Sequence, residues 1–202
     1  MTACARRFAL VTALWLCATL PLCAALPLRA DDAAPAWSPD PAQIAKLGSP
    51  EPIGAYRLRV PTGYTYLAVH GQIHSTINAW VGPVRDDGTH PYLLLLIVPR
   101  SEESDVGSVH DELIERLHGV AKMRIEWTHD PIERGNIGAY PFQRSHWQGL
   151  TPDRKWKVSG VLYVSADAAN YIVIASHDLA PYAADSLPVA EAAAQTFEKA
   201  LP

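Results

Sequence analysis

Residues 92 to 98, Tyr-Leu-Leu-Leu-Leu-Ile-Val, form an unbroken apolar run that Pro99 ends, and no other feature constrains the fold as strongly. A strand with one face in water alternates apolar and polar residues, whereas this run has no polar face. We therefore predict a strand at the centre of a sheet, covered on both sides by other parts of the protein.

Other segments also favour strands. Residues 56–60 alternate apolar and basic side chains, the two-residue period of a half-buried strand. Residues 86–88, Asp-Asp-Gly, are typical of a hairpin turn. A loop that bears Gly135 and Gly138 precedes the next predicted strand. Runs rich in Thr, Tyr, Ile, Leu and Val predict the remaining strands, at residues 64–70, 77–81, 124–128, 140–148, 156–165 and 171–176.

Two segments have the three- and four-residue spacing of amphipathic helices. The first covers residues 108–122 and begins at Ser108, a suitable N-cap. The second covers residues 186–201, with Ser186 as its cap and Pro188 in its first turn. Because strands and helices follow one another without a repeated β-α-β unit, we predict an α+β fold, mainly an antiparallel sheet packed with helices. The predicted buried side of the second helix comprises Ala190, Ala193, Ala194, Phe197 and Leu201.

The first 30 residues have the composition of a secretory signal peptide. Arg6 and Arg7 precede an uncharged stretch at residues 8–28, and an acidic segment follows Ala30. We predict cleavage after Ala30, with Ala25 as the alternative. The other interpretation is an uncleaved membrane anchor, because the uncharged stretch is long enough to span a bilayer.

All three cysteines lie inside this predicted leader, at residues 4, 17 and 23. The predicted mature domain therefore contains no cysteine, which excludes disulfides, iron–sulfur clusters and cysteine nucleophiles from it. Three of the 17 basic residues also lie within residues 1–30, whereas all 21 acidic residues follow residue 30, which leaves the predicted mature domain with a net charge of −7. Such a charge disfavours nucleic acid and anionic membrane surfaces as partners.

Residues 31–53 are rich in Pro, Ala, Asp and Ser, and we predict a linker there. The predicted division of the chain is thus a signal peptide at 1–30, a Pro/Ala-rich linker at 31–53 and a single α+β domain at 54–202. About 170 residues are enough for one domain to fold on its core alone.

Residues 56–64, Tyr-Arg-Leu-Arg-Val-Pro-Thr-Gly-Tyr, resemble the strand–Pro–x–Gly–aromatic entry of the PsbP-like α/β sandwich domains. The end of the chain is similar to theirs as well, with strands at 160–164 and 170–174 before a helix that ends around Phe197. This resemblance implies the same α+β fold. Members of that family include an accessory subunit of photosynthetic water oxidation, a small-GTPase-binding protein and bacterial envelope lipoproteins. The resemblance therefore implies binding or accessory work and transfers no particular site residue.

Motifs for catalysis or cofactor binding are missing from the sequence. There is no Gly-x-Ser-x-Gly nucleophile motif and no glycine-rich phosphate loop, so we predict no cofactor. His70 and His74 are four residues apart, but on a strand four residues span roughly 13 Å, too far to share a metal. We expect the protein to be non-catalytic and to hold no metal.

One helical cluster keeps an enzymatic alternative open. His110, Asp111, Glu115 and His118 lie on the polar side of the first predicted helix. A metal-dependent hydrolase would use histidines and carboxylates such as His110, Asp111 and His118. The same residues also have the composition of an ordinary solvated helix face.

The best candidate for binding is the segment from residue 140 to 156, which concentrates aromatic and basic side chains on an acidic domain. Such residues are the usual anchors of binding surfaces. The alternative places Phe142 and Trp147 in the core, with Arg144 and Lys155 in water. The candidate binding residues are Tyr140, Arg144, His146, Trp147 and Trp156.

These observations predict an exported periplasmic or extracellular protein. Its expected function is that of a non-catalytic accessory or binding domain of the cell envelope, which recognises another envelope protein or a small ligand. The alternatives are the metal-dependent hydrolase described above and a structural envelope component anchored by an uncleaved leader.

Cleavage after Ala30 has a direct consequence. Mass spectrometry of the protein purified from its native envelope should find a mature chain that begins at Asp31. A chain that still carries its first 30 residues would contradict the signal-peptide interpretation and favour the anchor.

Overall fold

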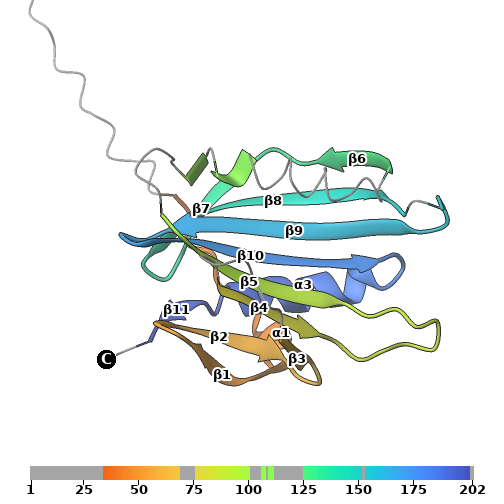
Figure 1. Ribbon diagram of the computed structural model, residues 1–202, viewed down its shortest axis with the longest axis horizontal. Coiled ribbons are helices and arrows are strands. Elements are labelled where there is room, and N and C mark those ends of the chain that lie inside the picture. The colour runs from red at the N-terminus through yellow and green to blue at the C-terminus, as the bar shows by residue number, and fades with distance from the viewer. Residues whose placement is uncertain are drawn as a thin grey trace, which may run out of the picture. The chain divides into compact units, whose positions relative to one another are not determined.

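The apolar run at residues 92–98 forms most of strand β5 (Tyr92–Pro99), which lies inside an antiparallel sheet. The computed structural model describes residues 34–68, 76–100, 106–107, 109–111, 125–151 and 153–200. The other strands of this sheet are β3 (Thr65–Ala68), β4 (Thr76–Val81), β6 (Ile125–His129), β7 (Glu133–Ile137), β8 (Tyr140–Leu150), β9 (Lys157–Ala166) and β10 (Asn170–Leu179). Their order is β3-β4-β5-β10-β9-β8-β6, with β7 paired to β8 (Figure 1).

The described residues also form a second sheet and the helices α1 and α3. Strand β2 (Tyr56–Pro61) pairs with β1 (Leu47–Ile53) and with β11 (Glu198–Lys199). Helix α1 (Pro41–Ile44) precedes β1, and helix α3 (Ala183–Ala194) follows β10. Helix α3 contacts β9 and β10 of the larger sheet and β2 of the smaller one. This arrangement confirms the predicted α+β fold.

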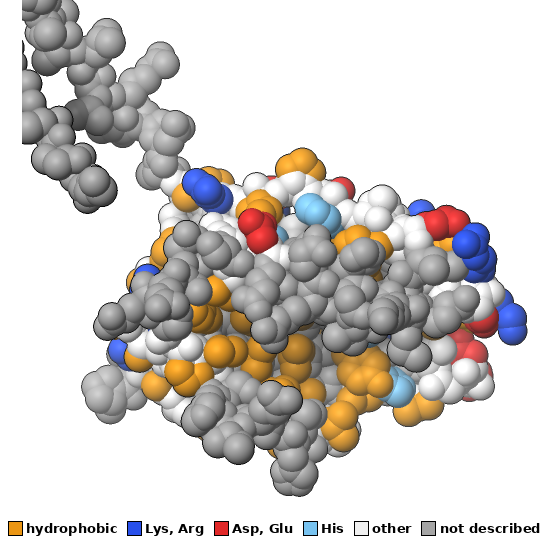
Figure 2. Space-filling model, turned by 45° about the horizontal axis from the view of Figure 1, so that its top comes forward, with side chains coloured by type: hydrophobic (Ala, Val, Ile, Leu, Met, Phe, Trp, Pro, Cys, Tyr) orange, Lys and Arg blue, Asp and Glu red, His pale blue; other side chains and the backbone are white. Residues whose placement is uncertain are grey.

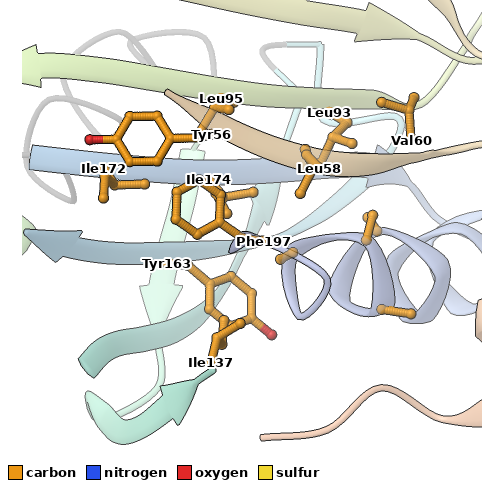
Figure 3. Packing of buried hydrophobic residues seen from close by; sticks show 14 of the residues in the cluster. Tyr56, Leu58, Val60, Leu93, Leu95, Ile137, Tyr163, Ile172, Ile174 and Phe197 are labelled. Atoms are coloured by element: carbon orange, nitrogen blue, oxygen red, sulfur yellow. The ribbon is translucent and has the colours of Figure 1, made fainter. Parts of the chain in front are cut away.

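The main hydrophobic core joins the two sheets and α3 (Figure 3). Leu93 and Leu95 of β5 are fully buried there, together with Leu58 of β2 and Ile172 of β10. Phe197, just after α3, is 2% exposed and packs beside them. The even-numbered residues of β5 point to the opposite face and are only half-buried. The predicted interior position of β5 is therefore correct, and Leu96 on its other face packs against a second buried cluster around Leu162, Val164 and Val173.

The predicted linker at residues 31–53 is wrong for its second half. Residues 41–44 form α1, and β1 pairs with β2 along residues 47–53. The composition is typical of a linker because β1 is an edge strand. An edge strand tolerates proline, here Pro50 and Pro52, and most side chains of β1 lie in water. Only Leu47 and Ile53, at its two ends, are buried.

Helix α3 also differs from the prediction at both ends. It begins at Ala183, before Ser186, and Pro188 lies inside it. The Ser186 hydroxyl does not cap the helix but donates to the Asp178 carboxylate at 2.6 Å. The helix ends at Ala194, because the following residues turn into β11 and pair with β2.

The loop predicted around Gly135 is instead strand β7. The Trp37 ring lies directly on Gly135, where a β-carbon would come within 2.2 Å of the ring. Gly138 has a positive φ of 56°, in the turn between β7 and β8. Of the predicted helix at 108–122, residues 109–111 are helical, and most of the others lie outside the described residues, as do His70 and His74.

A glycine in β9 generates a test of the sheet. A β-carbon at Gly160 would lie 2.3 Å from the Trp147 ring and 2.7 Å from the Ser176 carbonyl oxygen. We expect Gly160→Ala to lower the free energy of unfolding by about 2 kcal/mol, as overpacking does. Urea denaturation measures this change.

The matched control is Gly48→Ala in β1. Its β-carbon would lie no closer than 3.4 Å to any atom, an ordinary contact. We expect this variant to be neutral, or more stable by up to about 1 kcal/mol. Equal stabilities of the two variants would contradict the packing described here.

Candidate functional site

Strand β8 presents its candidate residues on two opposite faces. Because side chains alternate along a strand, Arg144 and His146 share one face, and Ser145 and Trp147 share the other. The contacts agree, since Arg144 and His146 both reach Glu191 of α3, whereas the Ser145 hydroxyl contacts His110. The face toward α3 is therefore the one that gathers charge.

Four side chains form a hydrogen-bonded network on this face. Glu191 is its centre, and its Oε1 lies 3.1 Å from His146 Nε2. The Tyr163 hydroxyl donates to Glu191 Oε2 at 3.1 Å, and Arg144 Nη1 donates to the same oxygen at 3.3 Å. Arg144 also pairs with Glu133 of β7. Glu191 thus joins three strand residues to the helix.

Trp37 covers one side of this network. The Arg144 guanidinium lies 4.5 Å from the centre of the Trp37 ring, a cation–π contact. Main-chain hydrogen bonds hold the ring in place, since the Trp37 amide donates to the Asn136 carbonyl at 2.8 Å. The segment just after the predicted leader is therefore a wall of the site.

The network shifts the titration of its two central groups. The hydrogen bond to Glu191 outweighs burial and raises the pKa of His146 above its ordinary value. Burial by itself would raise the pKa of Glu191, but the hydrogen bond from His146 and the positive charges of His146 and Arg144 hold it below its ordinary value. Both shifts favour the ionised form of the pair.

A groove opens beside His146, with a volume of about 210 Å³. Thr128 and Asp130 come from β6 and the residue after it, and Ser159 comes from β9. All these side chains carry hydrogen-bonding groups. Leu187 of α3 adds one apolar wall. Trp147 also lines the groove, which is therefore small and of mixed polarity, and His146 is its one lining residue that also belongs to the Glu191 network.

The structure brings two of the five candidate binding residues, Arg144 and His146, into the Glu191 network, and Trp147 lines the groove together with His146. Tyr140 packs against Phe197, with 5.4 Å between the ring centres. Trp147 is buried on the opposite face and stacks on Trp127 at 4.6 Å. Trp156 lies in the loop between β8 and β9 and is 41% exposed. A binding role for these residues stays a prediction.

Sequence reasoning missed Glu191 and Tyr163. Glu191 had a detectable signal, because it stands alone among alanines on an otherwise apolar stretch of helix. Tyr163 had none, since its place in an apolar strand is typical of a core residue. Its ring is fully buried, and only the hydroxyl reaches the network.

The alternative hydrolase residues do not form a metal site in the part of the chain that the structure describes. His110 is completely buried, with Nε2 3.2 Å from the Ser145 hydroxyl, and burial lowers its pKa. Asp111 lies 4.0 Å from the other ring nitrogen, and its side chain is 73% exposed. His118 lies outside the described residues. Among those described, no three His, Cys, Asp or Glu side chains come together in a way that could hold a metal ion.

Comparisons with known proteins define the class of the fold. No protein-family model matches this chain, and no curated protein matches it. Solved structures do match, and they show that the chain has a PsbP-like fold, as the sequence resemblance implied.

Two of these structures are informative. Cyanobacterial PsbP (CyanoP) from Synechocystis sp. PCC 6803 has 12% sequence identity and a TM-score of 0.59, over 81% of this chain and 98% of its own. LpqN of Mycobacterium tuberculosis, a protein involved in cell envelope biogenesis, has 11% identity and a TM-score of 0.53, over 74% of this chain and 83% of its own. No helix among the described residues is long and apolar enough to span a membrane.

The shifted pKa values predict how the network responds to pH. The raised pKa of His146 means that its stabilising contribution is complete below about pH 6.5 and is lost as the pH rises through the pKa of the folded state. The lowered pKa of Glu191 means that its contribution is present above about pH 4.5 and is lost at lower pH.

A double-mutant cycle with His146→Gln and Glu191→Gln measures the coupling. We expect a coupling free energy on the order of 1 kcal/mol near pH 6, where both groups are charged, and a smaller one at pH 9. Chemical denaturation of the four proteins at both pH values gives it. A coupling that grows toward pH 9 would contradict the proposed charge state.

Proposed function

We propose that this chain is an exported, non-catalytic accessory domain of the cell envelope that recognises a partner protein through the groove beside His146. The observation that carries the proposal is the Glu191 network, which raises the pKa of His146 and so favours its protonated form at the wall of an open groove. Residues on or next to the neighbouring strands β6, β8 and β9, together with Leu187 of α3, line the groove. A site fixed in this way is suited to recognition.

The size of the groove favours a partner side chain over a whole ligand. Pockets for drug-sized molecules usually measure about 300–1,000 Å³, more than the volume of about 210 Å³ found here. The groove therefore suits one inserted group. Because Asp130 accepts hydrogen bonds and protonated His146 donates them, a neutral amide side chain matches both.

The surface gives this proposal further support. On the face shown in Figure 2, acidic and basic side chains are mixed at one end, and hydrophobic side chains spread over the lower half. Elsewhere in the described chain, exposed charges also pair with opposite ones, as in Arg154 with Glu126 and Lys155 with Asp153. Among the described residues of this face no basic stripe appears. This favours a protein partner over nucleic acid.

The location in the envelope has two supports. The first is the predicted signal peptide at residues 1–30. The second is the likeness in fold to LpqN, a protein involved in cell envelope biogenesis. At 11% identity this likeness concerns the fold, so the envelope role remains our proposal for this chain.

Blocking the groove tests the proposal. Gln148 is exposed at the groove, and Gln148→Arg places a long charged side chain there. We expect this variant to lose, by at least about tenfold, a partner that the wild-type protein captures from envelope extract, as loss of an interface hot spot does. Quantitative mass spectrometry of the captured proteins measures the loss.

The matched control is Thr65→Arg. Thr65 is also an exposed strand residue, but it lies on β3, at the opposite edge of the larger sheet from β6. The control should capture the same proteins as the wild type. Equal capture by both arginine variants would remove the groove from consideration.

A further inference from the structure

A second pocket, of about 290 Å³, lies beside the first turns of α3, and none of its lining residues lines the His146 groove. Its walls come from the turn after β2, the segments before β5 and the first turns of α3. Pro61, Pro91 and Val189 make an apolar wall, and the rings of Tyr64 and Tyr182 also line the pocket. We call it the Tyr64 pocket.

Arg85 supplies a fixed cation to the Tyr64 pocket. Its Nη1 donates to Asp178 Oδ1 at 2.9 Å and to the Thr89 hydroxyl at 3.2 Å, and its Nη2 donates to Asp178 Oδ2. The Asp178 side chain is 1% exposed, and Ser186 also donates to it. These bonds use three of the five N–H groups of a guanidinium. The other two N–H groups make no hydrogen bond to the residues that the structure describes, and we take them as available to a ligand.

Two further donors line the pocket without a partner among the described residues. The Tyr64 hydroxyl makes no hydrogen bond there, and the Lys46 ammonium makes no ion pair. Burial, followed by the negative charge of Asp178, raises the pKa of Tyr64 to about 12, so its hydroxyl stays protonated. Lys46 is exposed at the mouth.

We infer that the Tyr64 pocket binds a small monocarboxylate with an apolar body. Its carboxylate would accept hydrogen bonds from the Tyr64 hydroxyl and the free Arg85 N–H groups and would pair with Lys46. Its apolar body would contact Pro61 and Pro91. The donors require a ligand with hydrogen-bond acceptors, and the proline walls require a ligand with an apolar surface. A sugar lacks the apolar body, and so does a free inorganic anion, so neither satisfies both requirements.

Charge and volume narrow the ligand further. Asp185 is exposed on the first turn of α3 at the rim, where its carboxylate disfavours a second negative charge on the ligand. A dry cavity of about 150 Å³ holds benzene. A pocket of about 290 Å³ therefore accommodates a molecule of two fused rings. An aromatic monocarboxylate such as 2-naphthoate combines these features and serves as the probe.

Calorimetric titration of the purified mature chain tests the inference. We expect saturable binding of 2-naphthoate, at least about tenfold tighter than binding of the neutral, equally sized 2-naphthamide, because hydrogen bonds to a charged group are the stronger ones. Tyr64→Phe keeps the ring and removes the hydroxyl, and it should weaken naphthoate binding about tenfold. Lys46→Met should weaken naphthoate binding and leave naphthamide binding unchanged.

The control variant is Lys155→Met, which makes the same change at an exposed lysine on the loop between β8 and β9. It should bind naphthoate as the wild type does. Absence of saturable binding, equal affinity for acid and amide, or an unaffected Lys46→Met variant would each overturn the inference. The experiment involves no partner protein, so its failure would leave the proposed role of the His146 groove untouched.

Discussion

The close approach of α3 to the larger sheet is the contact on which the rest of this structure depends. Alanines make it possible, because Ala190, Ala193 and Ala194 are almost fully buried and keep the helix near the strands. A helix faced with leucines would stand farther from the sheet. At this short distance Glu191 reaches His146 and Arg144 on β8, and Ser186 reaches Asp178 at the end of β10.

The two polar anchors of α3 determine where the helix sits along the sheet. Apolar alanine packing has little directional preference, since dispersion and hydrophobic forces are non-directional. Buried ionised groups are costly unless they are paired and hydrogen-bonded. The helix is therefore stable only where Glu191 reaches its partners on the strands and Ser186 reaches Asp178. The His146 groove and the Tyr64 pocket both lie against such an anchor, so the same contacts that orient the helix also shape the two candidate sites.

Local sequence patterns predicted the strands of the central sheet well, but they did not predict edge strands or contacts between distant segments. Strands β5, β9 and β10 were visible because each carries its apolar signal within its own residues. Strand β1 was not, since its polar and proline-rich interior is acceptable only at an edge, and an edge is defined by a neighbour. Strand β7 was not predicted, because a glycine such as Gly135 is typical of a loop. In the structure the missing side chain of Gly135 leaves room for the Trp37 ring, which packs directly on it. In the candidate site, the two-residue alternation placed Arg144 and His146 together. Their common partner Glu191, 45 residues beyond His146, followed from no local rule.

The amino-acid sequence alone determined the fold class, the interior position of β5 and the cysteine-free composition after residue 30. These properties follow from periodicity and composition, which act over a few residues. Only the tertiary structure decided that Trp147 belongs to the buried face, that Trp37 covers Arg144 and that α3 ends at Ala194. Each of these outcomes is set by contacts between segments far apart in the chain, and a side chain's role there depends on what the fold brings against it.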